Sequence, residues 1–430
     1  MRHLLQSFAS TGTIQVINLL TGVLVARLLL PEGRGELAIV LLWPNLMLAI
    51  GFLGLDQAVI YHAARAQERS KAVFLAALLP GSLLILATAA LGWCLLPWIL
   101  EPEHGALVGL SRLFLLIAAP LHLANNLLMA VLLGRQKLLQ WNLLRLVQPF
   151  CYLLALLALW AGEAVSVPHT LAAFIASSLA VTLTILPVGL RALRGAASAA
   201  PVAAVVGYAA RVHLQALCMI VVRRIDQALI SLYLLAADLG LYVVALALAS
   251  ALDMLSGTIS MVAFPKVSGQ LEDAGKRALF GRYFRFNLAL LLAGALALWL
   301  FGEWLLALLF GAPFREAGPV LRILVLAAVI QGISGSLAFG YKAHDRVAVV
   351  NQGALLSLLA AGPAFALLLP AQGLTGAAWA VTLVYAIGAL YMLLRLSGVL
   401  GIAPLKLLLP TADDAALLRH YRDALRARLR

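Results

Sequence analysis

Charged residues are scarce in this sequence: 18 Asp and Glu and 31 Lys and Arg make up 11% of its 430 residues. Soluble domains carry about 25% charged residues. A soluble enzyme, or a membrane anchor with a large globular head, is therefore excluded. Apolar residues make up 63% of the chain, and a chain of this composition lies mostly in a lipid bilayer.

Motifs for nucleotide hydrolysis and metal binding are also missing. The sequence contains neither a Gly-x-x-x-x-Gly-Lys-Ser/Thr loop nor a His-Glu-x-x-His pair, so we expect no ATP hydrolysis and no metal site. The three cysteines, Cys94, Cys151 and Cys218, each lie inside an apolar run, and their spacing suits neither zinc nor a disulfide framework. We expect a protein that is not an enzyme and has no cofactor, with coupling to H⁺ or Na⁺ left open.

Long apolar runs fill the sequence instead. They are continuously apolar and show no period-two alternation, which predicts membrane helices rather than barrel strands. At about 20 residues for each helix plus a connector, the chain accommodates on the order of a dozen spans. The predicted spans are 8–30, 37–61, 73–97, 110–133, 142–161, 170–190, 209–234, 240–264, 285–309, 318–340, 347–369 and 374–396. The predicted fold class is an all-α polytopic membrane protein.

The net charge of +13 fits this topology better than a nucleic-acid partner. With both termini in the cytoplasm, 22 of the 31 basic residues fall on cytoplasmic segments and three, Arg34, Arg112 and Arg315, fall on the other side. Basic residues are expected on the cytoplasmic side of any polytopic protein. The other six fall within spans or at their edges: Arg27, Arg145, Arg211, Arg223, Arg224 and Arg322.

The twelve spans divide into two sets of six at a polar break near residues 191–207. We predict an N-terminal six-helix lobe (1–195), a C-terminal six-helix lobe (196–397) and a cytoplasmic tail (398–430). The tail is predicted to be either a basic amphipathic helix on the membrane surface or a solvated basic helix without a specific role. A weak internal repeat supports the two halves. A shift of 205 residues places Gly35 on Gly240, and a shift of 206 places Gly134 on Gly340.

Four short stretches carry a family resemblance. Each is only a few glycines and apolar residues, so the specificity lies in their joint order and spacing. They are ARLLLPEGRGEL at 26–37, Asp226 followed by LGLY at 239–242, LFG at 309–311 before Phe314, Ala317 and Leu321, and LPAQGLTGAA at 369–378. The chain resembles the polysaccharide-transport branch of the multidrug/oligosaccharidyl-lipid/polysaccharide exporter superfamily.

The resemblance implies a two-lobed, inverted-V flippase of the bacterial inner membrane. Its substrate would be an undecaprenyl-pyrophosphate-linked glycan, such as an O-antigen (lipopolysaccharide) or exopolysaccharide repeat unit, moved from the cytoplasmic to the periplasmic leaflet. Its partners would be membrane lipids and the glycan polymerase or ligase machinery. Lipid II flippases of the superfamily usually have fourteen spans, so twelve predicted spans weigh against a role in peptidoglycan synthesis.

Ionisable residues at bilayer depth cost roughly 2.5–3.5 kcal/mol each on insertion scales, so they mark candidate sites. Arg223, Arg224 and Asp226 lie in the seventh span, and Arg27 lies in the first. Guanidinium groups bind phosphate oxygens bidentately, and these arginines are the predicted pyrophosphate ligands. Two alternatives stay open: an Arg223–Asp226 ion pair that neutralises itself, and an Arg27 side chain that extends to the membrane interface.

Two further carboxylates, Asp56 in the second span and Asp253 in the eighth, complete the candidate substrate site. They could pair with an arginine or bind a coupling H⁺ or Na⁺. The alternative transport function is a multidrug/cation antiporter, which would need a cavity rich in carboxylates and aromatic rings. A membrane glycan polymerase or ligase is disfavoured by the lack of a large external loop, and a non-transporting scaffold that acts through its basic tail is a further alternative.

Overall fold

The computed structural model describes residues 2–193 and 202–408. These residues form helices and short 3₁₀ turns and contain no strand. The α-helices of the first half are α1 (Arg2–Gly51), α2 (Leu55–Arg65), α3 (Ser70–His104), α4 (Val108–Gly134), α5 (Leu138–Ala161) and α6 (Val167–Ala192). Those that follow are α7 (Val202–Tyr233), α8 (Ala236–Ser268), α9 (Asp273–Phe310), α10 (Gly318–Ala343), α11 (Val347–Leu400) and α12 (Pro404–Leu408).

The predicted fold class is confirmed, because the chain is a polytopic all-α membrane protein. Nine helices within the described residues are long and apolar enough to cross a membrane. Of these, α11 holds two predicted spans, on either side of the non-helical residue Gly373 (φ 57°). The α1 helix holds the first predicted span and the beginning of the second, on either side of the non-helical residue Leu30 (φ 60°). The seventh predicted span, 209–234, corresponds to α7. The predicted boundary at 195/196 and the tail helix beyond residue 408 lie outside the described residues.

The second predicted span, 37–61, was expected to be continuous and is broken in the structure. The helix α1 ends at Gly51 and α2 begins at Leu55, and the connecting residues include Leu53 (φ 54°) and Gly54 (φ 68°). Both have left-handed backbone, which an α-helix does not accommodate. The break places Asp56 in the first turn of α2, where a carboxylate is favourably oriented to the helix dipole.

Two compact units divide the chain. The first contains residues 1–244 and 307–315, and the second contains residues 245–306 and 316–430. The α8 helix thus contributes its first turns to the first unit and the rest to the second. The two predicted lobes stay a prediction, because the structural units assign residues 202–244 to the first unit, together with α1–α6.

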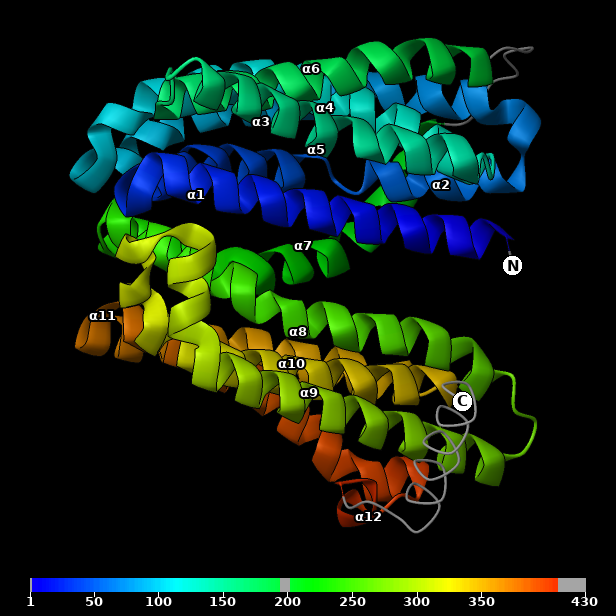
Figure 1. Ribbon diagram of the computed structural model, residues 1–430. Helices are drawn as coiled ribbons and strands as arrows, with labels where there is room; N and C mark the ends of the chain where they lie inside the picture. Colours follow the sequence, from blue (N-terminus) through cyan, green and yellow to red (C-terminus); the bar gives the residue numbers. More distant parts are fainter. Residues whose placement is uncertain (1, 194–201, 409–430) are drawn as a thin grey trace, which may run out of the picture. The chain divides into compact units, whose positions relative to one another are not determined.

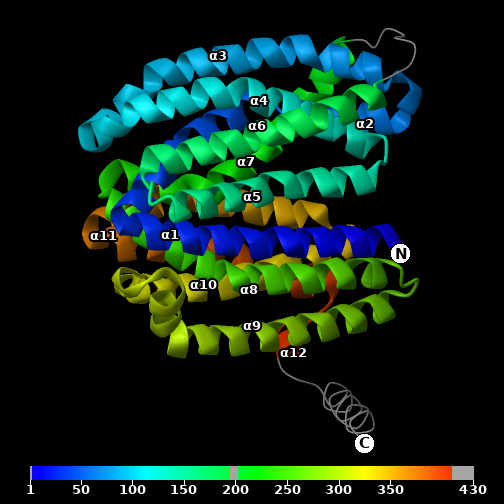
Figure 2. The same cartoon turned by 45° about the horizontal axis from the view of Figure 1, so that its top comes forward.

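Within the first unit, α1 packs against α5, α3 against α4, and α6 against both α4 and α5. Figures 1 and 2 show these helices running side by side. The α7 helix contacts α1, α2 and α3. This packing brings the polar residues of α1, α4 and α7 into one region of the unit.

Within the second unit, α9, α10 and α11 share a core of aromatic and aliphatic side chains. The Phe280 and Phe284 rings on α9, Tyr341 on α10 and Met392 on α11 are all buried. The Tyr341 hydroxyl donates to the Met392 carbonyl over 2.6 Å, so the polar end of this buried ring is satisfied.

Many large apolar side chains lie on the outside of the helices. Leu79, Leu83 and Leu86 on α3 are 61–67% exposed, and Trp98 on the same helix is 84% exposed. Water would penalise so much exposed apolar surface on one helix. Hydrocarbon does not, which agrees with the membrane assignment.

Candidate functional site

The candidate site begins with a close crossing of two backbones in the first unit. Gly35 on α1 lies against the start of α8: a Cβ built on Gly35 would lie 1.6 Å from the Ala236 carbonyl oxygen. A Cβ on Gly240 would lie 1.9 Å from the Pro31 carbonyl oxygen. No other residue fits at either position, so the two glycines allow the contact that holds this part of α1 beside α8.

Two side-chain hydrogen bonds place α7 in the same region. The Trp43 indole Nε1 on α1 donates to the Ser231 hydroxyl on α7 over 3.1 Å. The Tyr242 hydroxyl on α8 donates to the Asp226 Oδ2 on α7 over 2.8 Å. These hydrogen bonds join α7 to both α1 and α8.

A pocket of 530 Å³ opens among α1, α4, α7 and α8, all within the first unit. We call it the cationic pocket, because three arginines line it. Apolar side chains of α1 and α8 complete its wall. Its polar lining consists of Arg34, Asn45, His122, Arg223, Arg224 and Gln227.

The arginines of the cationic pocket differ in how their guanidinium groups are bound. The Arg34 Nε is buried and has no hydrogen-bond partner, and the structure shows none for the Arg223 guanidinium either, as far as residues 2–193 and 202–408 are concerned. Arg224 donates through Nη1 to the Gln227 Oε1 over 3.0 Å. A buried donor without a partner is rare and costly. We conclude that this pocket is chemically suited to an anion with several oxygen acceptors.

Asp226 does not form the ion pair with Arg223 that their spacing allows. Its side chain is only 4% exposed, and its carboxylate accepts from the Tyr242 hydroxyl and, over 2.8 Å, from the Gln227 backbone N–H. Within the described chain no ion pair joins Asp226 to Arg223. Asp226 is therefore not among the residues lining the cationic pocket and instead fixes α7 to α8.

Arg27 lies outside the cationic pocket. Its Nε donates to the Leu309 carbonyl over 2.7 Å, and its Nη2 donates to the Leu308 carbonyl. Both acceptors lie in the last turn of α9, where carbonyl groups lack partners within the helix. Arg27 thus caps the C-terminus of α9, and the structure does not bring it together with Arg223 and Arg224.

Neither Asp56 nor Asp253 is among the residues that line the cationic pocket. Asp56 is half-buried and accepts from the Gln57 Nε2 over 3.0 Å. Asp253 lies on the part of α8 that belongs to the second unit, and its side chain is exposed. No group of His, Cys, Asp and Glu suited to a metal ion occurs among the residues that the structure describes.

The residue that sequence reasoning missed is Arg34. The sequence places Arg34 in an external loop, because it follows Pro31 and Gly33 between two apolar runs. In the structure, helix resumes at once after Leu30, so Arg34 lies on a helix that reaches α8. The alignment of Gly35 with Gly240 is the one signal in the sequence, since these two glycines make the contact between α1 and α8, and Arg34 lines the pocket next to that contact.

Comparison with known families supports the sequence motifs. Residues 24–319 match the family described as "Polysaccharide biosynthesis protein". The match covers more than half of the chain and includes every residue that lines the cationic pocket. No curated protein sequence matches the chain.

Three solved structures resemble the fold of this chain. The lipid II flippase MurJ, in an inward closed conformation, aligns with a TM-score of 0.72 and 15% identity, over 91% of this chain and 87% of MurJ. An inward-facing multidrug resistance MATE family transporter of the MOP superfamily aligns with a TM-score of 0.70 and 15% identity, over 90% and 95%. A eukaryotic MATE transporter aligns with a TM-score of 0.62 and 12% identity, over 94% of this chain and 97% of the transporter. At these identities the likeness concerns the fold alone.

Proposed function

Since the chain belongs to the polysaccharide biosynthesis protein family, we propose that it is a flippase for an undecaprenyl-pyrophosphate-linked oligosaccharide. It moves an O-antigen or exopolysaccharide repeat unit from the cytoplasmic to the periplasmic leaflet of the bacterial inner membrane. The polar headgroup passes through the protein while the prenyl tail stays in lipid.

The observation that carries this proposal is the cationic pocket. Arg34 has a buried nitrogen without a partner, and Arg223 presents a guanidinium for which the structure shows no bond in the part of the chain that it describes. A pyrophosphate offers several anionic oxygens that can accept from planar guanidinium groups in pairs. A ligand in the pocket would meet the positive charge of both arginines, and its oxygen atoms could accept hydrogen bonds from the exposed Arg223 guanidinium.

The lining of the pocket disfavours the alternative of a multidrug/cation antiporter. No Asp or Glu lies among the residues that the structure places around the cationic pocket, whereas three arginines do. A cationic drug would meet repulsion there, because like charges in a partly desolvated site are unfavourable. The same charge attracts an anionic headgroup.

Translocation in reconstituted vesicles tests the proposal. The lipid-linked oligosaccharide is placed in the inner leaflet of proteoliposomes, and its arrival outside is measured by cleavage with an added glycosidase. We expect Arg34→Ala/Arg223→Ala to lower the rate by about 100-fold or more, since two charge-assisted interactions of about 1.5–3 kcal/mol each are lost.

The matched control is Arg282→Ala, which removes an exposed arginine from α9 in the second unit. It should transport at the rate of the unmodified protein. Normal transport by a correctly inserted Arg34→Ala/Arg223→Ala variant would refute the proposal. Ethidium efflux that persists in that variant would instead support the antiporter.

We further propose that the carboxylates act outside the anion site. Asp226 serves as a positioning residue for α7 through Tyr242. Asp56, at the break between α1 and α2, and Asp253 on α8 are candidates for coupling to H⁺ or Na⁺. Their roles are tested by measuring transport with and without an imposed ion gradient in Asp56→Asn and Asp253→Asn variants.

A further inference from the structure

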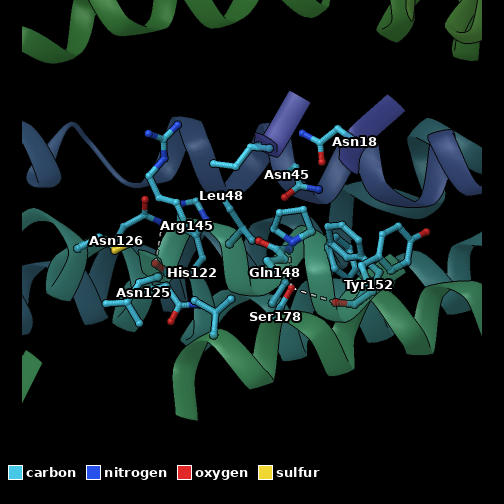
Figure 3. A pocket seen from close by; sticks show the side chains of 18 residues that line it. Asn18, Asn45, Leu48, His122, Asn125, Asn126, Arg145, Gln148, Tyr152 and Ser178 are labelled. Atoms are coloured by element: carbon cyan, nitrogen blue, oxygen red, sulfur yellow. Dashed lines mark hydrogen bonds between the residues drawn. The ribbon is translucent and has the colours of Figure 1, made fainter. Parts of the chain in front are cut away.

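A second pocket of 520 Å³ lies within the first unit, among α1, α4, α5 and α6. Figure 3 shows side chains from these helices converging on it. We call it the amide pocket, because Asn and Gln side chains dominate its polar lining. It shares Asn45 and His122 with the cationic pocket, so the two pockets adjoin.

Two side-chain amides, on α4 and α5, each have only one of their two polar atoms hydrogen-bonded within the described part of the chain. The Asn125 Oδ1 accepts from the Thr182 hydroxyl over 3.0 Å. The Gln148 Nε2 donates to the Ser178 hydroxyl over 3.0 Å. The Asn125 Nδ2 donor and the Gln148 Oε1 acceptor have no partner in the described part of the chain.

Two more amides are held by the backbone of their own helix. The Asn45 Nδ2 donates to the Leu41 carbonyl over 2.6 Å, and the Asn126 Nδ2 donates to the His122 carbonyl over 2.8 Å. Their Oδ1 atoms are not hydrogen-bonded within residues 2–193 and 202–408. None of these four amides has a fully buried unsatisfied atom, so their open ends face accessible space.

Aromatic rings form one wall of the same pocket. Phe174 packs edge-to-face with Tyr152 at 5.3 Å between ring centroids, and with Phe114 at 5.9 Å. All three line the pocket. Ring faces beside oriented amides give an apolar surface with a few placed polar groups, the usual composition of a small-molecule site.

The charge of the amide pocket limits the class of ligand. Its lining, as far as the described chain goes, contains one ion, Arg145, and no carboxylate. The Arg145 guanidinium stacks over the Trp141 ring at 4.4 Å. Open amide oxygens accept from hydroxyl groups, and an open amide N–H donates to them. A neutral ligand with many hydroxyls and an apolar ring face fits this set.

We infer that the amide pocket binds the sugar residue nearest the pyrophosphate. This inference rests on the proposed function, because the phosphate would occupy the adjoining cationic pocket. Asn45 and His122 lie at the junction of the two pockets, where the bond between phosphate and sugar would pass. The first sugar is then recognised by Asn125, Asn126 and Gln148, and its apolar face lies against Tyr152.

Comparing two lipids isolates the contribution of the sugar. Purified protein is titrated with undecaprenyl pyrophosphate, and separately with the same lipid carrying the oligosaccharide. We expect Asn125→Ala/Gln148→Ala to weaken binding of the glycosylated lipid by about 30-fold, as two hydrogen bonds of about 1 kcal/mol each are lost. Binding of the bare lipid should change less than about twofold.

Two further variants separate loss of sugar binding from disturbed helix packing and from the general effect of removing an amide. Asn126→Ala removes an amide bonded only within α4, so it leaves helix packing intact and should lower only the glycosylated affinity, by about fivefold. Asn351→Ala removes an exposed amide from α11 in the second unit and should change neither affinity.

The outcomes separate the two proposals. Equal weakening of both lipids by Asn126→Ala, or no weakening of either, would overturn the sugar site while leaving the flippase proposal intact. If Arg34→Ala/Arg223→Ala left the affinity for bare undecaprenyl pyrophosphate unchanged, the proposed function itself would fail. Selective loss of the glycosylated lipid in the amide variants supports the site.

Discussion

Arg27 and Arg34 lie seven positions apart on the same helix, on either side of its break at Leu30. The Arg27 guanidinium donates hydrogen bonds to two carbonyl groups at the end of α9. Within residues 2–193 and 202–408 the structure shows no hydrogen bond for the Arg34 guanidinium, and its Nε is buried. An arginine thus stabilises the fold at one position and lines the cationic pocket at the other.

This difference shows how to judge an arginine within a membrane protein. Inserting an arginine into a membrane is costly whether or not the residue binds a ligand, so cost alone does not identify a binding residue. What distinguishes the two is whether the protein already satisfies the donors. Arg27 should therefore matter to stability and Arg34 to binding, and each variant below tests that separation.

The largest effect is expected from Gly35→Ala, which removes the contact that holds Arg34 in place. Its Cβ would overlap the Ala236 carbonyl, so we expect a loss of more than about 4 kcal/mol of stability or failure to fold. The measurement is thermal denaturation in detergent. Gly22→Ala on the same helix meets no atom within 4 Å and should be tolerated; equal tolerance of both would contradict the crossing.

The second effect is on binding. Arg34→Ala should weaken the affinity for undecaprenyl pyrophosphate by about 10- to 100-fold, because one charge-assisted interaction is lost. Its melting temperature should be unchanged or higher, as a buried unsatisfied donor disappears. Titration and thermal denaturation of the same preparation test both statements. A destabilised variant with normal affinity would reverse the roles assigned to the two arginines.

The third effect is on stability, which Arg27→Ala should lower while leaving lipid affinity unchanged. Arg27→Ala should lower stability by about 1 kcal/mol, since two carbonyls at the end of α9 lose a cationic donor. Affinity for the pyrophosphate lipid should stay within about twofold. Arg27→Lys should restore part of the stability, because it keeps a charged donor near the helix end. Loss of lipid affinity in Arg27→Ala at unchanged stability would make Arg27 a ligand after all.

The smallest effect is expected on the salt dependence of lipid binding, which should change on substitution of Arg34 but not of Arg27. Raising NaCl from about 0.05 M to about 0.5 M should weaken binding of the anionic lipid by several-fold, because screening shortens the reach of the pocket's charge. The weakening should be smaller in Arg34→Ala, which has one cation fewer, and unchanged in Arg27→Ala. Equal salt dependence in all three proteins would show that Arg34 does not face the anion.

The helices were predictable because an apolar run is a local property of the sequence. The break between α1 and α2 was not, since Phe52, Leu53 and Gly54 continue the apolar composition around them. Only the backbone angles of Leu53 and Gly54 reveal it. The last predicted spans, 347–369 and 374–396, were separated correctly at Gly373, where a glycine does mark the non-helical residue.

The site was predictable only in part, for a related reason. Arg223 and Arg224 stand out because they interrupt an apolar span, and both line the cationic pocket. Arg34 follows a proline and a glycine and therefore looks like a loop residue. Asp226 was considered as a partner of Arg223 from their spacing, yet its partner Tyr242 lies on the next helix. Local spacing does not report such tertiary contacts.

The crossing of Gly35 and Gly240 also constrains how the two positions can change. Each glycine leaves the space that the other segment's backbone occupies, so an added methyl at either position forces the same two segments apart. Once one substitution has separated them, the second has little left to displace. The stability losses caused by Gly35→Ala and Gly240→Ala should therefore be strongly non-additive. A position in each half of the sequence thus depends on the residue at the other.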